Sequence, residues 1–368
     1  MNRKKLMTFL IIGVMLFSSS NVIAAQNNTT DTLDIEKSAI ETTKNSQSVK
    51  TFIEQMDNAN KQYGNAKAAS QNALASGKGN LIQATIINPI EAKNTFDKFT
   101  TNKDVNTNSV ILSAYSKYIT LLKVNYALNI QKDLTDNLEQ DNKNAQLQLA
   151  NGLITLNAAR LIEINYLKSE YRLNSLQNNL DSAYMAVNLA MGEDISKRYT
   201  TLMDYNIMPD NNYRTLDDCV KGAILKRGEI VNAQNTLDAK KKELFNEQYG
   251  SYNDYQFHVQ QAKYNIDNSQ NNLDEAKITV QLEINNGYKT LEGCMRAMES
   301  QQANYDLAES NYESAKIQYN NSMITLNQFQ DAEIAKSQAQ MNLKNAQLDA
   351  WLQQTKMNRA SGIGPGLN

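Results

Sequence analysis

The clearest pattern of apolar positions along the chain is a seven-residue repeat in its second half. Apolar or aromatic residues stand at strict intervals of seven at Ile284, Leu291, Met298, Tyr305, Tyr312 and Tyr319. Small residues follow three positions after members of this series, at Gly287, Cys294, Ala308 and Ala315. A strict seven-residue apolar repeat is typical of a left-handed coiled coil. We therefore expect one very long helix over about 256–319, with its tyrosines packed in a seam between helices.

A second pattern is an internal duplication. The segment Asn151–Asn157 (NGLITLN) recurs as Asn321–Asn327 (NSMITLN), at an offset of 170. The same offset relates scattered matches throughout 111–192 and 281–362, without a gap. Further upstream, Thr32-Leu33-Asp34 matches Thr215-Leu216-Asp217 at an offset of 183. Each copy is thus expected to contain a helix, a variable connection, a very long helix, a turn and a shorter helix. The copies are expected to differ in length only around 65–110 and 251–280.

The two repeated turns carry helix-capping residues. Thr325 and Gln328 fit a capping box, and Thr155 can cap a helix in the same way. Gly152 suits the left-handed position that follows a helix. Ser322 stands at the equivalent place and suits it poorly, so we expect the two turns to differ slightly.

The N-terminus has the pattern of a secretory signal. Basic residues at 3–5 precede an apolar core over 6–17, and Val22-Ile23-Ala24 supplies the small-residue pattern before Ala25. The core is shorter than the roughly 20 residues that a spanning helix needs. We therefore expect residues 1–24 to be a signal peptide and the mature chain to be exported.

Composition narrows the function further. The chain has only 3 Pro and 14 Gly in 368 residues, against a usual combined share of about 12%, which disfavours folds rich in turns. A net charge of −2 gives no basic surface for nucleic acid. With one His (His258) and two Cys (Cys219 and Cys294), the chain is poor material for catalytic or metal sites. We therefore expect no enzyme activity, no catalytic residue, no cofactor and no metal.

These features together define an expected organisation. Residues 25–192 form a first helical repeat, 193–214 a linker with Pro209, and 215–362 a second helical repeat. Residues 363–368, with Pro365 among glycines, are expected to be a disordered tail.

The ordered duplication resembles the outer-membrane efflux protein family (TolC-like). The stretches Leu153–Gly192 and Val280–Gly362 look most like it, and Thr215-Leu216-Asp217 before a helix looks like the start of that family's second repeat. The resemblance covers nearly the whole mature chain. It rests on the ordered duplication rather than on any one motif.

The resemblance implies an all-α fold of long antiparallel coiled-coil helices from two tandem repeats, which form an α-helical barrel as an oligomer. It further implies a homotrimer that docks a periplasmic-adaptor-type (membrane fusion) protein and works with an inner-membrane pump. The turns at the tunnel entrance then become the candidate adaptor contacts: Gly152, Thr155, Asn157, Ser322, Thr325 and Asn327.

One part of the family pattern is weak here. Family members insert a β-hairpin between the first helix and the long helix of each repeat, and three protomers close a membrane barrel with them. A spanning strand needs about 9–11 alternating residues. The first candidate region has one short apolar run, Leu81–Ile87, and the second soon shows helical spacing. We therefore expect little or no β-barrel.

Two functions follow. The first is an exit duct of a tripartite efflux or secretion system in the cell envelope, in the outer membrane if the organism has one and otherwise in the cell wall or outside the cell. The second is an exported coiled-coil scaffold or interaction protein of the cell wall, without a transport role. The second function leaves the exact duplication with matched turns unexplained.

Overall fold

The computed structural model describes residues 31–76, 83–205, 207–248 and 254–367, and their regular structure is almost entirely helical. The first four α-helices are α1 (Ile35–Asn45), α2 (Gln47–Ser76), α3 (Asn88–Ala150) and α4 (Leu156–Met191). The next four are α5 (Leu216–Lys226), α6 (Gly228–Glu247), α7 (Tyr255–Asn320) and α8 (Leu326–Ala360). A π-helical turn, Gln83–Ile87, precedes α3. The expected all-α fold class is confirmed.

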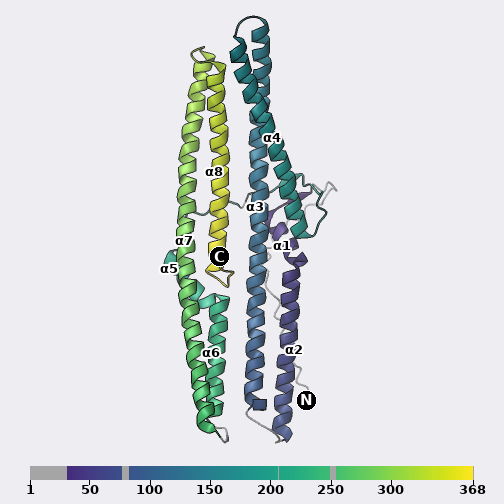
Figure 1. The fold of residues 1–368 in the computed structure, drawn as a ribbon, viewed down its shortest axis with the longest axis vertical. Coiled ribbons are helices and arrows are strands. Elements are labelled where there is room, and N and C mark those ends of the chain that lie inside the picture. Colours follow the sequence, from purple (N-terminus) through teal and green to yellow (C-terminus); the bar gives the residue numbers. More distant parts are fainter. Residues whose placement is uncertain (1–30, 77–82, 206, 249–253, 368) are drawn as a thin grey trace, which may run out of the picture.

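The molecule is elongated, and α3 and α7 run along most of its length (Figure 1). At one end they turn back into α4 and α8, and at the other end they follow α2 and α6. Helix α3 packs on α4, α2 and α8, and α7 packs on α8 and α6. Helix α3 therefore contacts both α4 and α8, and near the turns α4 also contacts α8, since Asn165 donates hydrogen bonds to Asn327 and Gln330. The two hairpins, α3–α4 and α7–α8, therefore pack side by side, with α7 on the far side of α8 from α3.

The seven-residue series predicts the packing of α7 correctly. Ile284 and Leu291 are buried in the core with α8. Further along the seam, the rings of Tyr312 and Tyr319 lie 5.5 and 5.3 Å from the ring of Phe329 on α8. The tyrosines are therefore part of the packing between helices, as expected.

The two repeats match closely on the turn side. Helices α3 and α7 end 170 positions apart, at Ala150 and Asn320, and α4 and α8 begin 170 positions apart, at Leu156 and Leu326. No insertion or deletion interrupts this half of the repeat. The offset expected from the sequence therefore holds for the turns and for the helix ends that flank them.

The upstream match of Thr32-Leu33-Asp34 with Thr215-Leu216-Asp217 is out of register. Helices α1 and α5 begin 181 positions apart rather than 183, and their N-caps are Asp34 and Thr215. Each cap side chain accepts a hydrogen bond from the backbone amide three residues later. Leu33 lies in a strand, whereas Leu216 is the first residue of α5. The equivalence rests on the capping position, which different polar residues can fill.

The first helix of each repeat is broken, where the sequence predicted one continuous helix. The breaks lie at Ser46 and Arg227, whose extended ψ values of 115° and 133° interrupt the helical path. After the breaks, α2 has 30 residues and α6 has 20. Pro89 lies in the first turn of α3, where its missing N–H costs no helical hydrogen bond.

A buried tyrosine joins the middle of the molecule to the linker between the repeats. Strands β1 (Thr32–Leu33) and β2 (Thr201–Leu202) pair in parallel. The hydroxyl of Tyr118, which is fully buried on α3, lies 2.8 Å from the carbonyl oxygens of Leu33 and Met203. These strands are the only strands in the described residues. The linker is therefore anchored to the core of the first repeat.

The expectation of a disordered tail is wrong for residues 363–367. The carbonyl of Ile363 accepts a hydrogen bond of 3.1 Å from Gly228 N–H, and the amide of Leu367 donates to Glu283. The Leu367 side chain occupies the space that a Cβ at Gly287 would need, since such an atom would lie 2.0 Å from Leu367 Cδ1. The absence of a side chain at Gly287 on α7 therefore permits the tail to pack closely.

A buried arginine ties together the helices next to this tail. Arg227, at the break between α5 and α6, is 2% exposed. Its guanidinium donates to Glu283 on α7 at 3.0 Å, to Glu229, and to the carbonyl of Ala360 at 3.3 Å. One cation therefore links the break, α7 and the end of α8.

In the described part of the chain, no helix is both long enough and apolar enough to cross a membrane. The signal peptide predicted over residues 1–24 lies outside the described residues.

Candidate docking end formed by the two hairpin turns

The six residues predicted from the sequence lie in the two turns, and both turns lie at the same end of the molecule (Figure 1). Gly152 and Ser322 are in the turns themselves, and Thr155 and Thr325 are the N-caps of α4 and α8. Asn157 and Asn327 are the second residues of those helices. The fold thus brings together all six candidate positions at this end.

The two turns have the same backbone geometry, and the expected difference between them is wrong. Gly152 and Ser322 both have left-handed φ values, of 70° and 58°. The amide of Gly152 donates to Leu149 O at 2.9 Å and that of Leu153 to Gln148 O at 2.9 Å. The equivalent bonds in the second turn measure 2.9 and 2.8 Å. This pair of bonds closes a helix end, and it holds Ser322 in a conformation that a side chain disfavours.

The caps agree with the sequence prediction. Thr155 Oγ1 accepts from the amide of Ala158 at 3.2 Å, and Thr325 Oγ1 accepts from that of Gln328 at 3.3 Å. The Gln328 side chain accepts in return from the Thr325 amide at 2.9 Å, which completes the capping box. Each returning helix therefore starts at a fixed residue.

Behind the turns, polar side chains connect the two hairpins. Asn137 Nδ2 donates to Glu333 Oε1 at 2.7 Å, and Gln330 Nε2 donates to Asp141 Oδ2 at 2.9 Å. Asn165 Nδ2 lies 3.2 Å from Asn327 Oδ1. Sequence reasoning missed these contacts, because amide side chains are frequent throughout the chain and carry no spacing signal. Only the packing of α3 and α4 against α8 reveals them.

Two carboxyl groups take part in this contact. Burial raises the pKa of Asp141, and the hydrogen bond from Gln330 opposes this shift. Burial also raises the pKa of Glu333, the nearby charge of Asp141 adds to the shift, and the hydrogen bond from Asn137 and the charge of Lys336 oppose it. The contact between the hairpins therefore favours protonated carboxyl groups more than water does.

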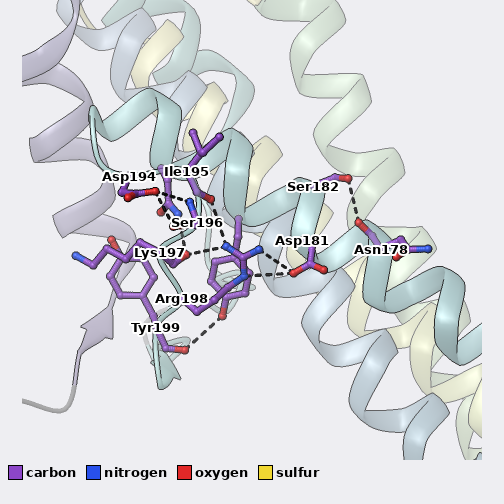
Figure 2. A network of polar contacts seen from close by, with 11 residues as sticks. Asn178, Asp181, Ser182, Asp194, Ile195, Ser196, Lys197, Arg198 and Tyr199 are labelled. Atoms are coloured by element: carbon purple, nitrogen blue, oxygen red, sulfur yellow. Dashed lines mark hydrogen bonds and ion pairs between the residues drawn. The ribbon is translucent and has the colours of Figure 1, made fainter.

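A separate polar network fastens the loop that follows α4 (Figure 2). Arg198 donates to Asp181 at 2.8 Å and to the backbone carbonyls of Ile195 and Lys197. Asp194 accepts from the amide and the hydroxyl of Ser196. These contacts involve side chains and backbone of one loop and the helix before it, so they stabilise the local chain path.

The described residues offer little material for catalysis. They contain no group of three or more His, Cys, Asp or Glu side chains arranged to hold a metal ion. Cys219 and Cys294 are free thiols, and burial raises the pKa of each. A raised thiol pKa reduces the fraction of reactive thiolate.

Comparison with known proteins identifies the fold. No family model matches the chain, and no curated protein matches it. Among solved structures, the chain is similar to CusC, with a TM-score of 0.69 and 12% identity over 93% of this chain and 96% of that chain. It is similar to the outer membrane protein VceC of Vibrio cholerae, with a TM-score of 0.67 and 12% identity over 90% and 96% of the two chains.

The CmeC outer membrane channel of Campylobacter jejuni is a third similar structure, with a TM-score of 0.66 and 13% identity over 89% of this chain and 86% of that chain. At these identities the likeness concerns the fold alone. The chain therefore has the fold of a protomer of TolC-like outer membrane efflux channels.

Proposed function

We propose that this protein is the exit-duct subunit of a tripartite efflux or secretion system, which forms an α-helical tunnel and docks an adaptor protein at its hairpin turns. The supporting observation is that the hairpins α3–α4 and α7–α8 pack side by side and carry two matched turns at one end. The similar fold of solved efflux channels supports the same function.

Exposed apolar side chains on α4 and α7 support the assembly of several copies into a closed ring. Outward apolar side chains are exposed on α4 at Leu161, Ile164, Leu167 and Tyr171, and on α7 at Ile278, Leu282, Leu307 and Ile317. These surfaces on α4 and α7 differ in sequence, and we expect α4 of one copy to pair with α7 of the next. Such head-to-tail pairing gives a ring where the rotation between copies closes. The family resemblance sets the expected number of copies at three.

The proposed partners and location follow from the same function. The duct meets a periplasmic-adaptor-type protein, which connects it to an inner-membrane pump. The chain is exported by the segment 1–24 and acts in the cell envelope. An exit duct needs no catalytic residue and no cofactor.

The mass and shape of the purified mature protein test this proposal. Native mass spectrometry and negative-stain imaging are expected to give an elongated hollow trimer. Tyr171→Glu is expected to break the trimer without loss of helical circular dichroism, whereas Tyr205→Glu, equally exposed but in the linker, leaves it intact. A monomeric or dimeric rod as the wild-type state would instead support the alternative, a coiled-coil scaffold of the cell wall.

A further inference from the structure

The two hairpin turns lie at different heights. Asn165, the tenth residue of α4, donates a hydrogen bond to Asn327, the second residue of α8. Asp141, nine residues before the end of α3, bonds Gln330, the fifth residue of α8. At 1.5 Å per residue, these pairings place the first turn roughly 7–12 Å beyond the second. Figure 1 shows the α3–α4 turn reaching beyond the α7–α8 turn.

Both hairpin ends are free of charge. Residues 144–159 and 317–330 contain no Asp, Glu, Lys, Arg or His. In the first end the side chains of Leu147, Leu153 and Leu156 are exposed, and in the second those of Ile317 and Met323 are exposed. Leu153 and Met323, at equivalent positions, are 72% and 73% exposed. The two ends are thus both uncharged and lie at unequal heights. The end at the α3–α4 turn, which reaches further, exposes more large apolar side chains than the other.

We infer that the two turns are unequal docking sites, and that the α3–α4 turn makes the leading contact with a neutral, apolar end of the adaptor protein. This inference rests on the proposed function. The α7–α8 turn, set back along the axis, then contacts only the flank of the same partner. A charged partner end would lose hydration against these turns without gaining an opposite charge, so the surface selects a neutral one.

Site-specific photo-crosslinking in cells tests this inference. A benzophenone amino acid replaces Leu153, Met323 or, as a control at the opposite end of the molecule, Phe245, which is exposed on α6. Position 153 is expected to crosslink to neutral, apolar residues of an adaptor protein, with a yield at least three times that of position 323. Position 245 is expected to give no such crosslink, and mass spectrometry identifies the crosslinked peptides.

The outcomes separate the inference from the proposed function. Equal yields at 153 and 323, or a higher yield at 323, overturn the unequal docking and leave adaptor docking in place. No adaptor crosslink at either turn of a correctly assembled protein counts against docking itself. In washed envelopes the yield at 153 is expected to change less than twofold between 50 and 500 mM NaCl. A steep fall with salt contradicts a neutral contact.

The matched substitutions Leu153→Asn and Met323→Asn give a second readout. Both place the same polar side chain at equivalent positions of two turns with the same backbone geometry. The first is expected to reduce crosslinking from an unchanged position, Leu147, at least as strongly as the second reduces it from Ile317. A larger effect of Met323→Asn argues against the leading role of the first turn.

Discussion

The two repeats of this chain agree on the side of the turns and differ on the opposite side. From the ends of α3 and α7 onward, every helix boundary around the turns repeats at 170 positions, and so do the hydrogen bonds that close the helices. On the other side α2 has 30 residues and α6 only 20. The half in which the offset of 170 holds is the half that carries the proposed docking end. Under the proposed function, a change of length in this half would displace one turn relative to the other, whereas the connections at the far end carry no such constraint.

The middle of the molecule shows a second difference. The break between α1 and α2 at Ser46 is bound by small polar contacts, whereas the break between α5 and α6 is built around the buried Arg227 and the chain tail. The repeats therefore use different chemistry for the same bend. Equivalent positions in the two repeats are therefore expected to contribute differently to the free energy of unfolding.

The largest loss in the free energy of unfolding is expected from substitution of Arg227. Arg227→Met removes the cation and leaves Glu283, whose side chain is 8% exposed, without its partner. Loss of one member of a buried ion pair costs about 3–5 kcal/mol. Urea unfolding followed by circular dichroism measures the loss.

The double variant Arg227→Met with Glu283→Gln is the control for this prediction. It removes the unpaired charge and is expected to recover part of the lost stability. Equal stability of the single and double variants would mean that the ion pair is not the source of the effect.

The next largest loss of stability is expected from one of two tyrosines at equivalent positions of the repeats. Tyr118 and Tyr288 stand 170 positions apart, but Tyr118 is fully buried with its hydroxyl between two carbonyls, whereas Tyr288 is half-buried beside Tyr213. Tyr118→Phe is expected to cost about 1–2 kcal/mol, because the Met203 carbonyl loses its donor and the Leu33 carbonyl keeps only the Met203 amide. Tyr288→Phe is expected to cost about 0.5 kcal/mol or less. Equal losses in thermal unfolding would contradict the different roles of the two positions.

Much of this fold could be predicted from the sequence. The spacing of Ile284, Leu291 and the tyrosines identified α7 and its seam, and the capping residues Thr155 and Thr325 identified the starts of α4 and α8. These signals are local, because they depend on residues close together in the chain. The exact duplication then placed the two turns in equivalent positions.

Other features depend on contacts between distant segments and left no local signal. The register of the first helices was wrong by two residues, because the Thr-Leu-Asp match pairs Thr32 with Thr215, whereas the equivalent caps are Asp34 and Thr215. Arg227 and Leu367 meet Glu283 only after α5, α7 and the tail have packed together. The unequal heights of the turns likewise depend on pairings such as Asn165 with Asn327.

Exchanging the residues at the left-handed positions of the two turns is expected to change stability less, and in opposite directions at the two positions. A left-handed φ costs a residue with a side chain about 1 kcal/mol more than glycine, and no neighbouring atom obstructs a Cβ at Gly152. Gly152→Ser is expected to lower stability by about 1 kcal/mol, and Ser322→Gly to raise it by a similar amount. The double variant, measured by calorimetry, is expected to be close to the wild type. A destabilising Ser322→Gly would show that the serine side chain makes a contribution of its own.

The smallest change in stability is expected at the contact between the two hairpins, and it depends on pH. Burial holds the pKa of Glu333 above its usual value in the folded protein, while the unfolded chain has an ordinary glutamate pKa of about 4.3. The folded state therefore binds the proton more tightly. The stability gained from this proton is complete below the unfolded pKa and is lost as the pH rises through the folded pKa.

Glu333→Gln retains an acceptor for Asn137 but carries no charge at any pH. At pH 7 the variant is expected to melt about 1–2 °C higher than the wild type, and at pH 4 the two are expected to melt together. Glu163→Gln, 170 positions earlier, is the matched control, because Glu163 lies on α4 and takes no part in the Asn137 contact. If Glu333→Gln changed the melting temperature equally at both pH values, the cause would be packing rather than the charge that the two hairpins enclose.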